Sequence, residues 1–553
     1  MIKSISLGEQ ILEMIDTLEQ AIVELYELAT NKDRKIYKFS KEMQAMLTAM
    51  YPVFEKLAKE ESALMSGKLC KNVEYSLANI MYLLQDSSNL ACQKIEYELL
   101  PLAQELYTDF YFWGFCYPDN NKMWNFYRNE MNDLCPLPYI KESEKINSYK
   151  YDLSIVLPAY NKLNFTKECV KYLFKYLPDN LSYELICINN GSNDETKLFF
   201  ESIHPNKQID IIENTKSFSV VSRIIEGKYT LFLSNDVILT PNAISNLLTC
   251  IKSDETIGCV APTCPNVSNL QEIPAEYSSI KEMIDFSIKN NISNPYRWEQ
   301  RARLTPPVAL ARSNNYFFYA LFCYTYPYTP DRVFGFSDDL MSLLMRRNGY
   351  KLILAKDTYV YHFGDNALKD YSSKKQNFYQ IGRKRFYDTF GIDPWGEGLC
   401  YDLKLVSSLS FSNVEPTEPT NILGINCGIG SDPLKIKEIL KETYHNINVI
   451  VYNITNNSNF SDDLRGVSDK FQYVKNIEMI KTLYDNIHFK YIIIEGSIEK
   501  QKNPVRIINK AYSLLTQDGI LAVKVVKLDL RNSLKGLYMQ MVINDEWIII
   551  KRI

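Results

Sequence analysis

The stretch Tyr229-Thr-Leu-Phe-Leu-Ser-Asn-Asp-Val-Ile-Leu-Thr-Pro241 decides how the middle of the chain folds. Its first five residues are mostly apolar and are branched or aromatic, a composition typical of a buried strand. Ser234, Asn235 and Asp236 follow at once, so the strand ends in polar side chains. Ligands of open α/β sheets bind at the carboxyl ends of strands, which makes Asp236 a candidate binding group. The same residue types are common in turns, so the stretch alone leaves both interpretations open.

Composition and charge bound the class of protein. A chain of 553 residues is long enough for about three or four domains. Its net charge of -4 gives no basic field for nucleic acid. The twelve cysteines form no Cys-x-x-Cys pair, and no apolar run reaches the roughly 18 residues of a membrane span. The start lacks the pattern of a signal peptide, so we expect a soluble, cytoplasmic protein with no membrane span.

Residues 1–115 are predicted to form a helical bundle. Apolar residues recur there at spacings of three and four, which is the pattern of one helix face. The pattern covers Ile11 to Leu25, Met43 to Leu57, Val73 to Leu84 and Ile95 to Trp113. Such amphipathic helices pack into a bundle, and no catalytic constellation occurs among them. Residues 116–150, which contain several prolines and charges, are expected to be a connector.

From Tyr151 onward, short apolar runs alternate with helical stretches. The expected strands before the opening stretch are Leu153–Leu157, closed by Pro158, then Glu184–Ile188 and Ile209–Ile212. This alternation predicts βαβ units and a mostly parallel sheet. The polar pairs Asn189-Asn190 and Asn235-Asp236 should then lie along one edge. A nucleotide would fit there without a Gly-x-Gly-x-x-Gly loop, with a divalent metal on Asp236 balancing the phosphate charge.

Two further motifs follow in the second half of this region. Ser337 can cap a helix whose first turn carries Asp338 and Asp339. Simple helix-end electrostatics would also explain that acidic pair. His362, one of four histidines, follows another apolar run; a packed or capped histidine is the competing interpretation.

Taken in order, these motifs resemble the family 2 glycosyltransferases of the GT-A fold over residues 151 to about 395. The matching segments are Ser154-Ile-Val-Leu-Pro-Ala-Tyr-Asn161, Ile188-Asn-Asn-Gly-Ser-Asn-Asp194, Asn214-Thr-Lys-Ser-Phe218, Leu231-Phe-Leu-Ser-Asn-Asp-Val237, Phe336-Ser-Asp-Asp-Leu340 to Tyr350, Val360-Tyr-His-Phe-Gly364, and Arg383 to Asp393. The resemblance implies a GT-A domain at 151–400 that moves a sugar from a nucleotide diphosphate to a hydroxyl with inversion.

The resemblance also implies roles for individual residues. Asp338 would be the catalytic base, with Asp339 in reserve, and it would take the acceptor's proton. Asp236 and His362 would hold a divalent metal, Mn²⁺ or Mg²⁺, on the departing diphosphate. The donor-binding residues would be Pro158, Ala159, Tyr160, Asn161, Asn189, Asn190, Lys216, Asn235 and Asp236. Two of these depart from the family pattern, because Asn189 and Asn235 stand where many members have Asp. Less negative charge should weaken metal binding.

After Pro419 a further domain is expected at residues 415–553. Thr420-Asn-Ile-Leu-Gly-Ile-Asn-Cys-Gly-Ile-Gly430 is a strand that leads into a glycine-rich loop, and more strand-like runs follow. The segment resembles the Rossmann-like S-adenosylmethionine methyltransferases, with Gly424, Gly428 and Gly430 in the turn. Asn453 stands where the ribose-binding acid is expected, and Glu495 lies in a poor motif. We therefore expect a degenerate module, with S-adenosylmethionine binding as the alternative.

The sequence thus predicts a multidomain α/β enzyme with three parts: a helical bundle, a GT-A domain and a Rossmann-like domain. The expected donor is a UDP-sugar, with UDP-N-acetylglucosamine the first expectation from the family. The acceptor is expected to be a hydroxyl of a protein, such as Ser or Thr of flagellin, or of a glycan. Two alternatives stay open: a bifunctional glycosyltransferase and methyltransferase, and a non-catalytic scaffold.

Overall fold

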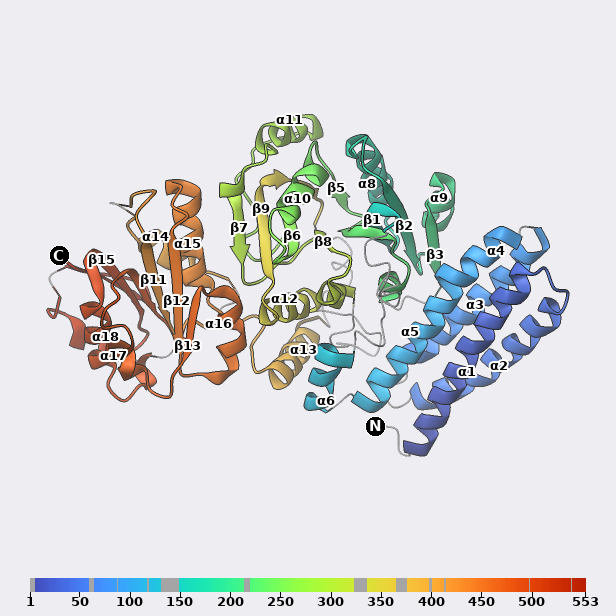
Figure 1. Ribbon diagram of the computed structural model, residues 1–553, viewed down its shortest axis with the longest axis horizontal. Coiled ribbons are helices and arrows are strands. Elements are labelled where there is room, and N and C mark those ends of the chain that lie inside the picture. The colour runs from blue at the N-terminus through green and yellow to red at the C-terminus, as the bar shows by residue number, and fades with distance from the viewer. Residues whose placement is uncertain are drawn as a thin grey trace. The chain divides into compact units, whose positions relative to one another are not determined.

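The structure is a computed structural model (Figure 1). It describes residues 5–58, 64–86, 88–116, 119–130, 149–212, 219–322, 336–364, 375–396, 400–411, 414–496, 498–538 and 540–553. The chain forms two compact units. The first comprises Met1–Ser245, Pro307–Ser337 and Val360–Thr389, and the second comprises Asn246–Pro306, Asp338–Tyr359 and Phe390–Ile553.

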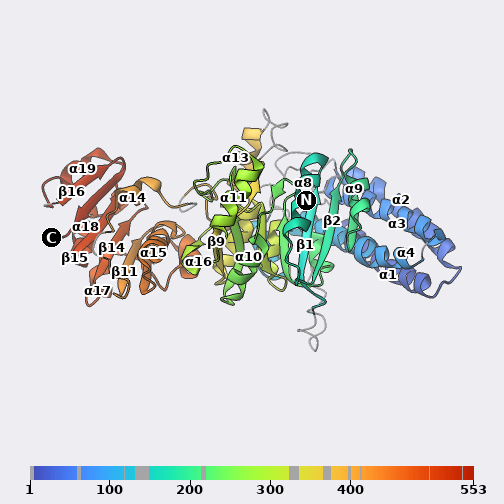
Figure 2. The same ribbon diagram turned by 90° about the horizontal axis from the view of Figure 1, so that it is seen from above.

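The first unit begins with the predicted helices. They are α1 (Ile5–Thr30), α2 (Ile36–Ala58), α3 (Leu64–Asp86), α4 (Ser88–Lys94) and α5 (Leu100–Tyr111), with the π-helical turns η1 (Ile95–Leu99) and η2 (Phe112–Cys116) on either side of α5. Figures 1 and 2 both show these helices side by side. The predicted apolar face is confirmed, since Leu18, Ile22 and Leu25 are fully buried. In the expected connector, α6 (Asn120–Asn125) and η3 (Phe126–Glu130) are helical.

Five strands of the first unit are neighbours in the order β3-β2-β1-β4-β8. Their bounds are β1 (Tyr151–Ala159), β2 (Tyr183–Asn190), β3 (Lys207–Ile211), β4 (Gly227–Leu233) and β8 (Val308–Arg312). β1, β2, β3 and β4 pair in parallel, as predicted, while β8 runs antiparallel to β4. The other elements are α8 (Leu163–Tyr176), α9 (Thr196–Ile203), η4 (Ser219–Arg223), η6 (Tyr316–Phe322) and α13 (Lys375–Phe390).

The expectation that Pro158 closes the first strand is wrong. β1 continues through Pro158 to Ala159, in register with Ile188 and Asn189 of β2. Pairing of β1 with β4 ends at Val156. Pro158 therefore lies where one side of the strand has left its ladder, a position that tolerates the missing N–H of proline.

The second unit contains the neighbouring strands β6 (Ile257–Thr263), β9 (Lys351–Tyr359) and β7 (Trp298–Arg301), in that order. The helices around them are α10 (Ala243–Lys252), α11 (Ile280–Asn290), the 3-10 turn η5 (Pro295–Arg297) and α12 (Ser337–Arg347). α12 is the helix predicted from the acidic pair, and it ends at Arg346 and Arg347 as expected. Gly349, at a φ of +82°, lies two residues beyond that end.

The predicted C-terminal α/β domain is also present in the second unit. Its sheet has the order β13-β12-β11-β14-β15-β17-β16, with the first five strands parallel. The strands are β11 (Thr420–Ile425), β12 (Val449–Thr455), β13 (Lys470–Tyr473), β14 (Phe489–Ile494), β15 (Leu515–Lys524), β16 (Gln540–Asn544) and β17 (Trp547–Lys551). The helices are α14 (Leu403–Ser408), α15 (Ser431–Tyr444), α16 (Ser461–Val467), α17 (Ile480–Leu483), α18 (Pro504–Ser513) and α19 (Leu528–Leu534), with the 3-10 turns η8 (Ser458–Phe460), η9 (Ile477–Met479) and η10 (Ile498–Lys500).

The antiparallel hairpin β16–β17 was not predicted from the sequence. Trp547 at its second strand is fully buried and anchors the hairpin to β15. None of the described helices combines the length with the apolar composition that a membrane crossing needs. The helical, central α/β and C-terminal α/β parts of the predicted fold are thus confirmed, whereas the exact domain boundaries stay predictions.

Candidate functional site

The opening stretch places a carboxylate beside an imidazole in the first unit. After β4, the short strand β5 (Val237–Ile238) pairs antiparallel with β10 (Tyr361–His362), and His362 lies opposite Val237. The backbone N–H of Phe363 donates to the Asp236 carbonyl at 3.0 Å. This pairing brings Asp236 Oδ2 to 3.3 Å from His362 Nε2. Asp236 and His362, which were both predicted as metal ligands and are far apart in sequence, therefore lie side by side.

The Asp236–His362 pair fits half of a metal site. Two adjacent ligands on one ion, each at about 2.1 Å, lie roughly 3 Å apart, close to the observed separation. Carboxylate oxygen and imidazole nitrogen are both ligands that Mn²⁺ accepts. No group of three or more His, Cys, Asp or Glu side chains in the described ranges is arranged to hold an ion. The further ligands would have to be phosphate oxygens and water, as is usual for magnesium at phosphate sites.

Ser234 orients the Asp236 carboxylate, a role that the sequence did not suggest. Its hydroxyl donates to Asp236 Oδ1 at 2.7 Å, which leaves Oδ2 toward His362. Asn235 does not contact the Asp236 carboxylate in this way. Its amide donates to the buried hydroxyl of Thr166 on α8 at 2.9 Å. Asn235 therefore ties the end of β4 to α8.

The ends of β1 and β2 are joined through Asn189 and Asn161. The Ser192 N–H donates to the side-chain oxygen Oδ1 of Asn189 at 3.2 Å, and the Ser192 hydroxyl accepts from the Asn161 N–H at 2.9 Å. Asn161 has a φ of +54°, a conformation that asparagine tolerates, and its side-chain oxygen accepts from the Asn193 N–H at 2.8 Å. The two loops therefore form one connected edge.

Asp210 on β3 is a buried carboxylate that the sequence reasoning missed. It is the register partner of Asn189, and its Oδ1 accepts from the Asn189 amide at 3.4 Å. Asn189 and Asn190 are 5% and 3% exposed. Asp210 thus fixes which way the Asn189 amide faces. A period-two count from Ile209 could have found it as a polar residue in an apolar strand.

Charges from the N-terminal helices converge on Asp210. Lys94 lies 3.9 Å from Asp210 Oδ2 and 2.8 Å from Glu98 Oε2, while Lys197 lies 3.8 Å from Asp210. Burial lowers the pKa of Lys94, but the neighbouring Glu98 and Asp210 charges outweigh it, so that pKa lies above its usual range. The helical bundle is therefore electrostatically linked to the strand beside Asn189.

The remaining predicted donor residues are Pro158, Ala159, Tyr160 and Lys216. Pro158 and Ala159 are buried within β1, whereas Tyr160 is 39% exposed at its end. Lys216 lies outside the described residues.

Asp338 and Asp339 begin α12 in the second unit, and they differ in partner. Arg303 contacts Asp339 with two of its three guanidinium nitrogens, Nε to Oδ1 at 2.6 Å and Nη2 to Oδ2 at 3.3 Å. Burial first, and then the Asp339 charge, raise the pKa of Asp338 to about 7, while Arg303 opposes the rise. Cys259 on β6 also lies within reach of the Asp338 charge. Asp338 is thus the side chain that titrates near neutrality, and Asp339 is an ion-paired neighbour.

The predicted methyltransferase turn is occupied by its own side chains. Asn453 is fully buried, and its amide donates to the Ser468 hydroxyl at 2.8 Å. A methyl group on Gly424 would meet Asn453 Oδ1 at 2.0 Å. Burial and the nearby Asp432 carboxyl hold the pKa of Glu495 well above its usual range. Asn453, expected at the ribose, is therefore bonded to Ser468, and Glu495 interacts with Asp432.

Part of this chain is similar in sequence to known proteins. Residues 154–301 match the family model described as Glycosyl transferase family 2. An uncharacterized glycosyltransferase of Synechocystis is 36% identical over 69 residues, which cover 12% of this chain and 22% of that protein. One of Rickettsia prowazekii is 30% identical over 105 residues, or 18% and 32% of the two chains. The matches thus span less than a third of these relatives.

Among solved structures, GalNAc-T7 with UDP, GalNAc and Mn²⁺ is similar to this chain with a TM-score of 0.29 and 14% identity, over 38% of this chain and 44% of that one. A TM-score this low adds nothing to the family match. Residues 154–301, which include most of the parallel strands β1 to β4 and the polar end of β4, are therefore the part of the chain that is similar to the family 2 glycosyltransferases.

Proposed function

We propose that this protein is an inverting glycosyltransferase that moves a sugar from a nucleotide diphosphate to a hydroxyl group. The observation that carries the proposal is the Asp236–His362 pair at the end of β4. Asp236 lies within residues 154–301, which match the family 2 model. Ligand binding at the carboxyl ends of parallel strands agrees with that position.

The donor side of the mechanism rests on residues of the first unit. Asp236 and His362 would hold a divalent metal, which when bound supplies Lewis-acid stabilisation of the departing diphosphate. Ser234 keeps the Asp236 carboxylate oriented. Asn189, with its amide fixed by Asp210, keeps one N–H and one oxygen lone pair for the edge of a base. That donor–acceptor pair suits a uracil edge and supports a UDP-sugar, with UDP-N-acetylglucosamine as the proposed donor.

The acceptor side rests on Asp338. The acceptor oxygen forms a bond to the anomeric carbon while the bond from that carbon to the diphosphate oxygen breaks, and the hydroxyl proton passes to the Asp338 carboxylate. Attack opposite the leaving group inverts the anomeric centre. A base with a pKa of about 7 is close to neutral pH, where general-base catalysis is most effective. The sequence offered Asp339 as the second candidate for the base. Its ion pair with Arg303 instead favours a role in positioning.

The acceptor and the location stay proposals from the architecture. We propose a protein hydroxyl, with Ser or Thr of flagellin as the first candidate and a glycan as the second, in the cytoplasm. The C-terminal domain is proposed to be a degenerate methyltransferase-type module. The burial of Asn453 favours this over a bifunctional enzyme.

The pH dependence of turnover tests the base. Turnover of sugar nucleotide in wild type should rise with pH through about 7, because Asp338 acts in its ionised form. Asp338→Asn should reduce turnover about 10²- to 10⁴-fold. Asp339→Asn removes a negative charge and leaves Arg303 uncompensated, so the rise should move to lower pH. Release of nucleoside diphosphate, measured between pH 5 and 9, reports the turnover of wild type and of both variants. Unchanged turnover in Asp338→Asn would mean that Asp338 is not the base or that the domain is a non-catalytic scaffold.

Metal and donor binding are measured by thermal shift with a panel of nucleotide sugars. With Mn²⁺ and a UDP-sugar at about 100 times its Kd, the unfolding midpoint of wild type should rise by at least about 3 °C. Asp236→Asn and His362→Gln should lose the part of that rise which depends on Mn²⁺. Asp179→Asn, at an exposed carboxylate of the same unit, serves as the matched control. An equal Mn²⁺ response in Asp236→Asn would argue against the metal site.

Intact-mass spectrometry identifies the acceptor class. After incubation with UDP-N-acetylglucosamine, flagellin should gain the mass of one or more N-acetylhexosamine residues, and Asp338→Asn enzyme should add none. If wild-type enzyme turns over donor but flagellin keeps its mass, the protein-acceptor proposal fails and glycans are the next candidates.

Calorimetry with S-adenosylmethionine separates a degenerate module from a second enzyme. We expect no heat of binding at millimolar ligand, because Asn453 is fully buried against Gly424 and its amide is bonded to Ser468. A saturable heat signal would restore the bifunctional alternative.

A further inference from the structure

The C-terminal end of α12 is held by a single carboxylate of the C-terminal domain. Asp463 on α16 is fully buried. It accepts from Arg346 Nε at 2.8 Å and from Arg347 Nε at 2.9 Å, and a further short contact joins it to Arg346 Nη2. Arg347 Nη2 also donates to the Phe390 and Asn459 carbonyls. Two consecutive arginines of α12 thus depend on one acid about 116 residues later in the chain.

The backbones of α12 and α16 touch at this point. A methyl group on Gly466 would lie 1.9 Å from the Arg346 carbonyl oxygen and 2.8 Å from its carbon. Real side chains never approach backbone so closely, so glycine is required for the two helices to meet. The charge contact and the glycine contact fix the same end of α12.

The segment Ala302-Arg303-Leu304 lies along the rest of α12. Arg303 pairs with Asp339 in the first turn, the Leu304 N–H donates to the Ser342 hydroxyl at 3.2 Å, and Arg346 Nη1 contacts the Ala302 carbonyl. The helix is therefore bound at its first, middle and last turns to one extended stretch of chain.

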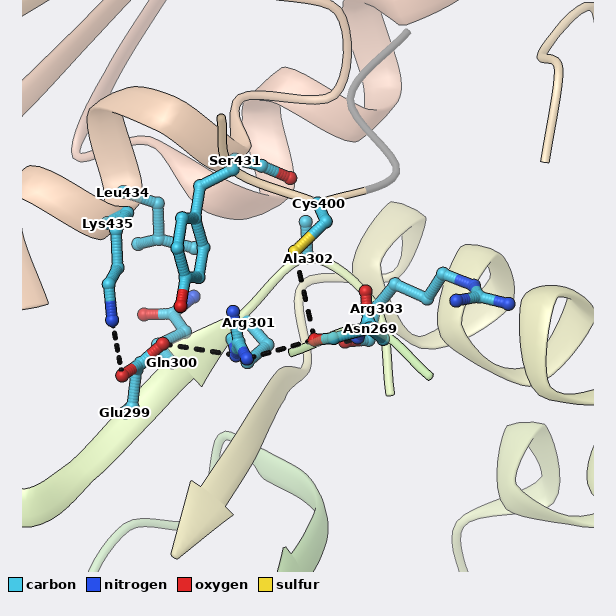
Figure 3. Close-up of a pocket in the computed structure, with 11 residues that line it drawn as sticks. Asn269, Glu299, Gln300, Arg301, Ala302, Arg303, Cys400, Ser431, Leu434 and Lys435 are labelled. Carbon is cyan, nitrogen blue, oxygen red and sulfur yellow. Dashed lines mark hydrogen bonds and ion pairs between the residues drawn. The ribbon is translucent and has the colours of Figure 1, made fainter. Parts of the chain in front are cut away.

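The strand that leads into this segment is bound from its other side by the C-terminal domain. Figure 3 shows Lys435 of α15 pointing toward Glu299 at one end of a pocket, while the Arg303 side chain at the other end points away from α15. Lys435 lies 2.8 Å from Glu299 Oε2. The Tyr401 ring lies between Arg301 and Lys435, at 4.9 Å and 4.5 Å from its centroid. Each contact is a charge or cation–π interaction out of bulk water, where such interactions are strongest.

The glycine-rich turn serves the same contact. A methyl group on Gly430 would lie 2.7 Å from Val467 and 3.1 Å from Leu464, both on α16. Gly430 therefore lets α16 pack onto the start of α15, with Ser468 at the end of α16 receiving the Asn453 amide. The turn that resembles a ligand-binding motif therefore packs against α16, the helix that carries Asp463.

We propose that the C-terminal domain is a brace for α12, the helix that carries Asp338, and that Asp463 is the positioning residue that holds it in place. The proposal rests on the proposed function in that Asp338 acts as the base. Loss of the Asp463 carboxylate leaves Arg346 and Arg347 without their buried counter-charge, so the end of α12 must move toward water. Asp338, Asp339 and Arg303 are on or against the same helix, and their spacing changes with it.

Asp463→Asn, compared with Asp462→Asn, tests the brace. Asp462 is the preceding residue of α16, and it is half exposed in a surface pair with Arg465, an interaction of little energetic weight. Hydrogen exchange of residues 337–347 should speed up at least about tenfold in Asp463→Asn and stay at the wild-type rate in Asp462→Asn. Turnover should fall at least about tenfold with an unchanged donor KM. The rise of turnover with pH should shift to lower pH, because the uncompensated arginines favour ionised Asp338; the groups that face Asp338 are Asp339, Arg303 and Cys259.

Two further variants keep the test decisive. Asp463→Glu retains the charge and should keep the wild-type position of the pH rise. Gly466→Ala retains all charges but wedges α16 from α12, and it should speed exchange in residues 337–347 without a comparable pH shift. Thermal shift with a UDP-sugar verifies that each variant keeps its donor site. If Asp463→Asn matches Asp462→Asn in exchange, KM and pH profile, the brace is refuted. If wild type itself shows no turnover, the proposed function fails, and hydrogen exchange still decides the brace.

Discussion

Two carboxylates and one guanidinium meet at the first turn of α12, and their contacts decide how charge is balanced there. Arg303 donates to both carboxylate oxygens of Asp339, so its positive charge mainly balances the charge of Asp339. Asp338 is left partly buried beside a negative charge, and its pKa rises to about 7. Neighbouring acids whose environments push their pKa values apart are a recognised way to obtain one positioned, ion-paired group and one working base.

The donor side shows a related solution to missing charge. Asparagines occupy positions 189 and 235, where the family often has acids. The structure places Asp210 directly across from Asn189, and Lys94 and Lys197 lie within 4 Å of that carboxylate. The acid on the neighbouring strand therefore orients the Asn189 amide. At the end of β4, Ser234 and His362 complete the surroundings of the one remaining carboxylate.

Local patterns predicted the elements, and long-range contacts decided the rest. The apolar run before Ser234 and the helical spacing of Ile11 to Leu25 are properties of a few consecutive residues, so the strands and helices could be inferred from them. The Asp236 and His362 positions followed from motif order, and the structure brings them together. Asp210, by contrast, is significant through Asn189 and Lys94, which lie 21 and 116 residues away. In the same way, the importance of Asp463 comes from its contact with Arg346, which is distant in sequence. The basic end of α12 looked like ordinary helix-dipole compensation, and no local signal distinguishes that from a buried pairing partner in another domain.

The glycine-rich turn after β11 illustrates how one sequence pattern serves two physical needs. A glycine after a strand permits a close approach, and a ligand phosphate or methionine is one group that can approach. A helix is another. At Gly424 the approaching group is the Asn453 side chain, and at Gly430 it is Val467. Both glycines are therefore required even with no ligand bound, and the asparagine in place of the expected acid agrees with this use. The spacing of glycines identifies the fold of such a turn, while the polarity and burial of the residue at the end of the next strand decide whether the turn is open to a ligand.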